Sequence, residues 1–387
     1  MQQRIYFDAN AGAPLLPEAR AAAVTALDAM ANASSVHAEG RGARASVESA
    51  RAAVAGAVGG RPENVIFTSG ATEAAALALS PRIIAGGDVK PVGRLYVGAT
   101  EHACVLSGGR FAGSTVTVLP VTRSGVVDLT ALRRALAEHD PSEGAPYVAL
   151  MLANNETGVI HPVPEVARLT KAHGGYVFCD AVQALGRIPV EVEALGVDFL
   201  ALSSHKIGGP QGAGALVLAD GAVSPEPLLT GGGQERRRRA GTENVAAIAG
   251  FGVAAGRASH HLSDASRIAA LRASLEREVT RIAPEALIFG TEAERLPNTT
   301  LFAVSGLPAE TAVIAFDLEG VAVSAGSACS SGKIAESHVL AAMGEPPGTT
   351  RGGIRVSLTS ASDETEVDAF VAAWRSIYRR MRQSTAA

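Results

Sequence analysis

The chain has 387 residues, of which 47% are hydrophobic and 19% are charged, and its formal net charge is −4. A chain of this size and composition can bury a large core and is long enough for one large domain and a smaller one. The weak negative charge gives no reason to expect nucleic acid or an anionic membrane surface as a partner. The sequence shows neither a secretory signal nor an apolar run that could span a membrane, so we expect a cytoplasmic protein.

Three cysteines lie far apart in the chain, namely Cys104, Cys179 and Cys329. An odd number of cysteines at wide spacing argues against a disulfide framework and against a zinc site. We therefore expect free thiols and no metal.

The first part of the chain predicts a short extended segment at residues 5–7. Two stretches with helical spacing of apolar residues follow, at 17–30 and 42–58. From there to about residue 220, strand-like apolar runs alternate with helical patterns. This alternation is typical of a mostly parallel sheet with helices on both faces. Ligands of such sheets bind outside the carboxyl ends of the strands, so the residues that follow each apolar run are candidates for a site.

Five apolar runs of this part are followed by polar side chains. These side chains are Thr68, Ser69, Thr72, Glu73, Thr100, Glu101, His102, Asn154, Asn155, Glu156, Asp180, Gln183, Ser203, His205 and Lys206. Any one of them could cap a helix or form a turn. Five such ends in succession would instead place a phosphate cradle, an imidazole, two amides, a carboxylate and a lysine around one cavity.

The segment 203–210 suggests the ligand. Lys206 follows two hydroxyls and an imidazole and precedes glycines that allow close approach of the backbone. A solvated surface lysine is the simple alternative. These neighbours of Lys206 better fit a lysine that forms an imine with pyridoxal phosphate. Ser203 and His205 would then be close enough to contact the phosphate.

The other polar groups also have roles in such a site. Residues 69–72 open a helix whose first N–H groups and dipole could hold the phosphate, helped by the Thr72 hydroxyl, unless they form only an N-cap. Asp180 could keep the pyridine nitrogen protonated, with an N-cap again as the alternative. His102 could stack on the ring and move protons, although single histidines are often structural.

Residues 231–242 combine glycines with four consecutive arginines. A nucleic-acid patch is one interpretation, but the run is short, has no interleaved aromatic residues and lies in an acidic chain. We favour a loop that reaches an anionic cofactor or substrate.

The pattern changes after residue 256. An amphipathic stretch at 265–282 is followed by strands and helices without the earlier alternation, and the chain ends in a helix predicted from Glu364 to about Met381. This part predicts a second, smaller domain.

Two residues of this second part call for a chemical explanation. Cys329 lies in a run of small residues; cysteines are usually buried, whereas a thiol on an exposed Gly/Ser-rich loop could be a nucleophile, with Lys333 favouring its thiolate. Arg355 lies in an apolar strand, where an unpaired charge is costly. Its partner is either the carboxylate of a ligand or a structural salt bridge.

Taken together, these motifs resemble those of the cysteine desulfurases, the NifS/IscS-like branch of the fold-type I pyridoxal phosphate enzymes and class V aminotransferases. The similarity runs from about Tyr6 to the last helix. It implies an α/β fold whose mostly parallel central sheet, flanked by helices, forms a large cofactor-binding domain of residues 14–256. A smaller α+β domain of residues 1–13 and 257–387 would carry the cysteine loop. The matching motifs occupy residues 68–73, 154–158, 180–183, 204–206, 239–242 and 327–331.

The resemblance also implies roles for single residues. Lys206, His102 and Cys329 would be catalytic. Asp180 would pair with the pyridinium, Gln183 would bond the ring hydroxyl, and Thr242 would reach the phosphate of the neighbouring subunit. Asn155 and Arg355 would bind the substrate carboxylate. The full set of cofactor-binding residues would be Ala71, Thr72, His102, Asn155, Asp180, Gln183, Ser203, His205, Lys206 and Thr242.

The implied reaction converts L-cysteine to L-alanine and leaves the sulfur on Cys329 as a persulfide, in a homodimer with composite sites. An iron–sulfur scaffold or another sulfur-acceptor protein would then receive the sulfur. A selenocysteine lyase, a cysteine-sulfinate desulfinase and another class V aminotransferase are alternatives with the same fold. A non-catalytic binding subunit is the alternative of a different class. The chain departs from the residues usual in the family at positions 9, 12, 13 and 74–76.

Overall fold

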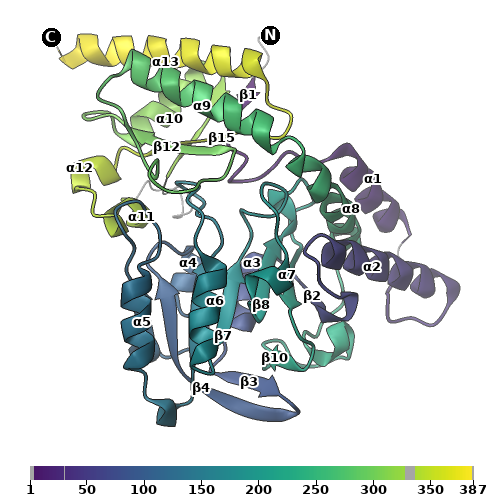
Figure 1. Cartoon of the computed structure of the whole chain (residues 1–387). Helices are drawn as coiled ribbons and strands as arrows, with labels where there is room; N and C mark the ends of the chain where they lie inside the picture. Colours follow the sequence, from purple (N-terminus) through teal and green to yellow (C-terminus); the bar gives the residue numbers. More distant parts are fainter. Residues whose placement is uncertain (1–3, 30, 327–335, 386–387) are drawn as a thin grey trace.

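The computed structural model describes residues 4–29, 31–326 and 336–385. For residues 384 and 385 it describes the backbone only. Two α/β parts lie one above the other in Figure 1, and the larger lower part holds most of the first 260 residues. Within the described residues, none of the helices combines the length and the apolar character that a membrane crossing requires.

A nine-stranded sheet forms the centre of the larger part. Its strands lie in the order β10-β3-β4-β6-β7-β8-β9-β2, and β5 also pairs with β4. The pairs from β4 to β8 are parallel, whereas β3 and β9 pair antiparallel with both of their neighbours. The prediction of a mostly parallel sheet is thereby confirmed for its centre. The strands are β2 (Val65–Thr68), β3 (Arg82–Ala85), β4 (Asp88–Gly98), β5 (Val116–Leu119), β6 (Ala145–Met151), β7 (Tyr176–Asp180), β8 (Phe199–Ser203), β9 (Gly214–Leu218) and β10 (Val223–Pro225).

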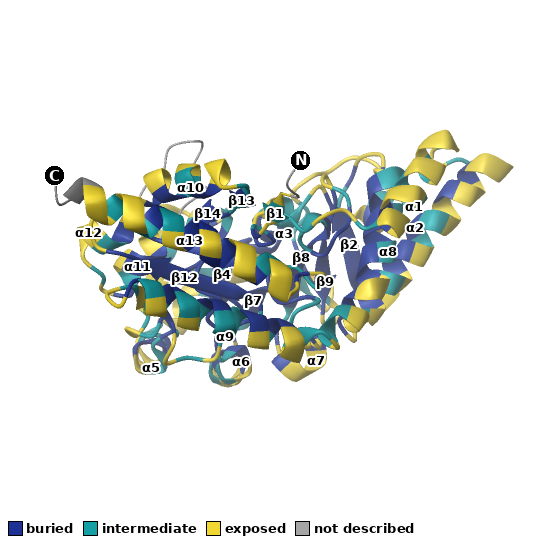
Figure 2. Cartoon of the chain, turned by 90° about the horizontal axis from the view of Figure 1, so that it is seen from above, coloured by how far each residue is buried: buried dark blue, intermediate teal, exposed yellow. Residues whose placement is uncertain are grey.

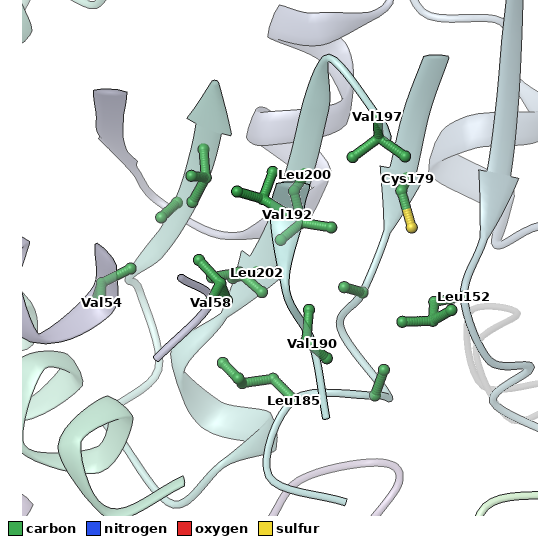
Figure 3. Close-up of a cluster of buried hydrophobic side chains, with 14 of the residues drawn as sticks. Val54, Val58, Leu152, Cys179, Leu185, Val190, Val192, Val197, Leu200 and Leu202 are labelled. Atoms are coloured by element: carbon green, nitrogen blue, oxygen red, sulfur yellow. The ribbon is translucent and has the colours of Figure 1, made fainter. Parts of the chain in front are cut away.

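Successive side chains of the central strands enter two hydrophobic cores on opposite faces of this sheet. On β7, Val177 and Cys179 pack into one core and Phe178 into the other, as the alternation along a strand requires. Figure 3 shows the first core, where Leu200 of β8 lies beside Val192 and Cys179 projects from the neighbouring strand β7. Helices that contribute to the first core are α1 (Pro17–Asp28), α2 (Ala38–Gly56), α5 (Leu129–Ala137), α6 (Val163–Ala172), α7 (Val192–Leu195) and α8 (Val245–Leu262), and those of the second are α3 (Ala71–Ala78) and α4 (Ala103–Leu106).

The smaller part is an antiparallel sheet with helices on it. Its aromatic core joins Phe7 from the start of the chain to Phe316, Phe370 and Trp374. The elements are β11 (Leu287–Ile288), β12 (Thr299–Ala303), β15 (Ile354–Ser357) and β14 (Ser324–Ala325) in sheet order, the parallel pair β1 (Ile5–Tyr6) and β13 (Val321–Ala322), and the helices α9 (Ala265–Ile282), α10 (Ala309–Leu318), α11 (His338–Ala342), α12 (Pro347–Thr350) and α13 (Glu364–Thr385).

The separate cores support a division into two domains. We propose the predicted boundaries, with residues 1–13 joining the smaller domain, because β1 pairs with β13 and Phe7 lies in its core. Helix α8 runs across the proposed boundary at residue 256. The connection between the two domains is therefore a continuous helix at that point.

Most helix ends lie close to the predicted ones. Helix α9 has the predicted bounds, and α13 continues beyond Met381 to Thr385. Helix α2 begins four residues before the predicted start because His37 caps it, its Nδ1 accepting the Gly40 N–H at 3.3 Å. In Figure 2 the buried residues of α2 lie on the side of the helix that faces the rest of the molecule, as amphipathic periodicity requires.

Candidate active site

A cavity of about 460 Å³ lies at the carboxyl ends of the central strands. Met151, Asp180 and Ser203 are the last residues of β6, β7 and β8, and all three line it. The sheet therefore brings the ends of its parallel strands together, as predicted. Of the predicted cofactor-binding residues, Ala71, Thr72, His102, Asn155, Asp180, Gln183, Ser203, His205 and Lys206 line this cavity.

Lys206 ends the single turn Ser204–Lys206 that follows β8. Its Nζ donates hydrogen bonds to the backbone oxygens of Asn10 at 2.5 Å and Ala11 at 3.0 Å. Asn10 and Ala11 also line the cavity, although the sequence motifs did not single them out. The N-terminal segment thus forms one wall of the site around the lysine ammonium.

Asp180 and Glu101 are two buried carboxyl groups whose environments differ. Burial raises the pKa of Asp180, while the backbone N–H of Val182, bonded at 2.9 Å, and the neighbouring charges of His102 and Lys206 lower it. Burial raises the pKa of Glu101 well above its ordinary value, and the charge of Asp180 raises it further. Burial therefore raises the pKa of both carboxyl groups, and it does so more strongly for Glu101 than for Asp180.

The buried Glu101 leads to a prediction about stability and pH. Its pKa is higher in the folded chain than in the unfolded chain, so the folded chain retains a proton that the unfolded chain releases as the pH rises above 4.5. The wild type therefore loses stability with rising pH through this group. We expect Glu101→Gln, which keeps the neutral shape, to remove that loss, so that the stability of the variant relative to the wild type rises from pH 5 to pH 8 in urea titrations.

The control for this experiment is Glu165→Gln. The hydrogen bond from Arg168 lowers the pKa of Glu165 to about 2, so this group is ionised in both the folded and the unfolded chain above pH 5. Its variant should differ from the wild type by the same amount at pH 5 and pH 8. The raised pKa of Glu101 would be contradicted if Glu101→Gln behaved in the same way.

His102 caps the short helix α4 at the edge of the cavity. Its Nδ1 accepts the backbone N–H of Cys104 at 3.3 Å and lies 3.0 Å from the Cys104 Sγ. Because a backbone N–H can only donate, the neutral imidazole carries its proton on Nε2. Cys104 lines the cavity as well, which the sequence analysis missed, and its position two residues after His102 is the only signal for it.

Around the N-terminus of α3, hydroxyl and N–H donors gather that suit a phosphate. Thr72 and Ser203 supply hydroxyls, and Gly70 precedes the first turn of the helix. Burial and the charge of Lys206 lower the pKa of His205 to about 4, so this imidazole is neutral at physiological pH and can donate one N–H.

Three predicted residues do not line the cavity. Thr242 is exposed and lines a separate cavity of about 130 Å³, which shares Ser69 and Gly212 with the main one. Arg355 is buried in β15, where it forms the ion pair that was the structural alternative. Cys329, like Lys333, lies outside the described residues.

Arg355 nevertheless touches the wall of the cavity. Its Nη2 donates to Asp8 Oδ1 at 2.9 Å and its Nη1 to the backbone oxygen of Asn155 at 3.2 Å. The Nε is buried, and no partner for it occurs among the residues that the structure describes. The ion pair with Asp8 therefore uses part of the guanidinium only.

The arginine run has partners within the chain. Arg236 and Arg238 donate to the backbone oxygen of Glu63 at 2.6 and 3.1 Å, and Arg239 pairs with Glu73 at 2.8 Å. These contacts fix the loop against the large domain. Arg236 and Arg237 are exposed, whereas Arg238 and Arg239 are half-buried.

As a set, the groups around the cavity fit pyridoxal phosphate. A buried carboxylate, a lysine, a histidine and a cluster of hydroxyl and N–H donors at a helix N-terminus surround a space of the size that cofactors occupy. Each group is the type that one part of that molecule needs, namely the ring nitrogen, the aldehyde carbon, the ring face and the phosphate.

Comparison with known proteins agrees with this fit. Residues 5–370 match the family model of the class-V aminotransferases. The chain is 38% identical over 364 residues to the cysteine desulfurase IscS of Dictyoglomus turgidum, covering 92% of this chain and 90% of that one. It is also 38% identical over 371 residues to an IscS-like cysteine desulfurase of Mycobacterium tuberculosis, covering 94% and 93%.

The fold has close counterparts among solved structures. A NifS-like protein from Rickettsia africae superposes with a TM-score of 0.85 at 33% identity, covering 97% of this chain and all of that one (100%). A second NifS-like protein gives a TM-score of 0.84 at 31% identity, covering 97% of this chain and 99% of that one. With the family model spanning nearly the whole sequence, the chain belongs to the class-V aminotransferases, a family of enzymes that depend on pyridoxal phosphate.

Proposed function

We propose that this protein is a cysteine desulfurase, which takes the sulfur from L-cysteine and releases L-alanine. Lys206, Asp180 and His102 line one cavity in a chain whose relatives, 38% identical over most of their length, are named cysteine desulfurases. The convergence of these three side chains is the observation that carries the proposal. A cysteine substrate follows from the relatives and from the amino-acid chemistry that the cofactor supports.

Bound in the cavity, pyridoxal phosphate would withdraw electrons from the α-carbon of the amino acid. Asp180 would hold the ring nitrogen protonated, and the neighbouring charges of His102 and Lys206 favour the ionised form of this carboxyl group. Ala71, Thr72, Ser203 and His205 would hold the phosphate. Lys206 would be the attachment point and, once displaced by the substrate, the base that removes the α-proton.

His102 has one atom suited to proton exchange. Its Nδ1 is occupied by Cys104, so Nε2 is the atom that would pass a proton to or from the substrate. Asn155 and Arg355 would bind the substrate carboxylate, and the buried Nε of Arg355 without a partner in the described residues supports this role.

We propose Cys329 as the sulfur acceptor. Its thiolate would attack the substrate sulfur, forming an S–S bond while the C–S bond breaks and its electron pair stays with the substrate carbon. The protein would then hold a persulfide and the substrate, after protonation, would leave as alanine. An iron–sulfur scaffold or another acceptor protein would receive the sulfur in the cytoplasm.

The proposal includes a homodimer. Thr242 is exposed and lies outside the cavity of its own chain, which suits a residue that completes the site of a second copy. Thr242 would then contact the partner's phosphate.

Replacing Cys329 by alanine tests the proposed desulfurase activity. We expect Cys329→Ala to release no sulfide from L-cysteine while keeping the visible absorbance of the bound cofactor. Mass analysis of the wild type after incubation with L-cysteine should find one added sulfur on the peptide that contains Cys329. Sulfide release at the wild-type rate by Cys329→Ala would refute the persulfide step, and a protein that gains no visible absorbance with added cofactor would refute the enzyme assignment.

A further inference from the structure

Arg187 is a half-buried cation close to the site for which the proposed chemistry has no use. It lines a second cavity, of about 150 Å³, which lies on the other side of Lys206. Burial and the nearby charge of Arg355 lower the pKa of Arg187 to about 10. In the described chain no carboxylate pairs with it, and a buried cation without an acid partner is costly to keep.

The contacts of Arg187 are all with oxygen acceptors around Gln183. Its Nη1 donates to the Gln183 backbone oxygen at 2.7 Å and also to the side-chain Oε1 of Gln183. Its Nη2 donates to the backbone oxygen of Ala9 at 3.4 Å. Gln183 and Arg187 are four residues apart in the turns that follow β7, so the contact between them is local in sequence.

These contacts determine which way the Gln183 amide points. The oxygen end accepts from the guanidinium, and the nitrogen end donates to the backbone oxygen of Asn10 at 3.0 Å. A flipped amide would turn its NH₂ group toward the guanidinium donors and its oxygen toward the Asn10 oxygen. Both new contacts would be repulsive, because donor would face donor and acceptor would face acceptor.

The fixed amide lies next to the attachment point of the cofactor. The Asn10 oxygen that accepts from Gln183 Nε2 also accepts from Lys206 Nζ at 2.5 Å. Gln183 also lines the main cavity. An N–H donor is therefore held beside the lysine, and the guanidinium on the far end of the amide polarises it and strengthens this donor.

We propose that Arg187 is a positioning residue that orients the Gln183 amide so that its N–H donor faces the cofactor beside Lys206. The proposal rests on the cofactor chemistry of the proposed function. A donor at this place stabilises negative charge on the cofactor, and the positive charge of Arg187 acts in the same direction. Both effects favour loss of a proton from the bound cofactor, so both lower the pH midpoint at which its visible absorbance changes.

The test is a pH titration of the visible absorbance of the holoenzyme. In Arg187→Met, which removes the cation but keeps an unbranched side chain, the midpoint should move to higher pH by about one to two units, the size expected for one hydrogen bond to a charged group. Arg187→Lys keeps a cation that can reach the Gln183 Oε1, so its midpoint should stay close to that of the wild type. Gln183→Met should move the midpoint in the same direction as Arg187→Met.

Additivity separates positioning from a general effect of charge. If Arg187 acts through Gln183, the double variant should shift the midpoint by less than the sum of the two single shifts. The matched control is Arg272→Met, since Arg272 is also half-buried and donates to a backbone oxygen, that of Leu296 at 2.5 Å, but lies outside both cavities. This control should leave the midpoint unchanged.

An unchanged midpoint in Arg187→Met, or fully additive shifts in the double variant, would overturn the inference. If Arg187→Met does not fold, Arg187→Gln takes its place in the same double-variant comparison with Gln183→Met, because it also removes the cation. The absorbance is measured without substrate. A protein that binds no cofactor would therefore refute the proposed function, whereas a bound cofactor with an unchanged midpoint would refute only the role of Arg187.

Discussion

Replacing Lys206 by alanine should lower kcat on L-cysteine by about 10³-fold or more, the loss expected when one residue supplies both the covalent attachment and the proton transfer. Lys206 lies at the end of β8 in the main cavity, with its Nζ at the backbone oxygens of Asn10 and Ala11. No other lysine lines this cavity in the described chain, so no neighbouring amine can replace it.

Lys206→Arg distinguishes the chemistry from the charge. Arginine retains the positive charge but cannot lose its proton at working pH, so it should be as inactive as alanine. Borohydride reduction should attach the cofactor covalently to the wild type, detected by intact mass, and to neither variant. The exposed Lys90 pairs with Asp88 on the hairpin far from the cavity, and Lys90→Ala should have wild-type activity. Substantial turnover by Lys206→Ala would contradict the assignment of this lysine.

Replacing Glu235 by alanine should lower the free energy of unfolding by about 3–5 kcal/mol, the range for removing one partner of a buried ion pair. Glu235 is buried and accepts from both terminal nitrogens of the Arg51 guanidinium, at 2.7 and 2.8 Å. It also accepts the backbone N–H of Phe67 at 2.9 Å, and the Arg51 guanidinium lies 4.8 Å from the centre of the Phe67 ring. Removing the carboxylate leaves the Phe67 N–H without its acceptor, and the Arg51 guanidinium keeps only Glu48 at 3.2 Å and the Val65 backbone oxygen at 2.8 Å.

The same ion pair holds a strained loop. Glu235, Arg236 and Arg237 have φ angles of 46°, 56° and 66°, a left-handed conformation that residues other than glycine rarely adopt. Each such residue costs on the order of 1 kcal/mol, which the surrounding contacts must offset. Since this loop leads into Thr242, we expect Glu235→Ala to loosen the segment that carries the proposed contact to the second subunit.

The measurement for Glu235→Ala is the urea midpoint at constant m-value. Glu278→Ala is the matched control, because Glu278 pairs with Arg281 on the exposed side of α9 and exposed pairs of this kind contribute little. We expect no resolved change of the midpoint in the control. Equal midpoints for the two variants would mean that the Arg51–Glu235 pair contributes no more than a surface pair.

Much of the fold and the cofactor site could be predicted from local patterns. The alternation of apolar runs and helical periods predicted the sheet and its helices, and nine of the residues predicted to bind the cofactor line one cavity. These features are properties of contiguous sequence, because strand and helix periods extend over a few residues and parallel strands end at one edge of their sheet. Helix α9 was predicted to its last residue for the same reason.

Other features depend on contacts between distant parts of the chain, so only the tertiary structure decided them. The sequence allowed two partners for the Arg355 charge, a ligand carboxylate or a structural salt bridge. The fold brings Arg355 to Asp8, which lies 347 positions away in the chain. Arg51 finds Glu235 at a separation of 184 positions, and β1 joins the small domain by pairing with β13. The periodicity of the sequence does not indicate such partners, because these contacts form only when the elements pack against one another. The sequence by itself thus determined the elements, their order and the chemistry at the strand ends, while packing alone determined which charges pair and which amide is oriented beside Lys206.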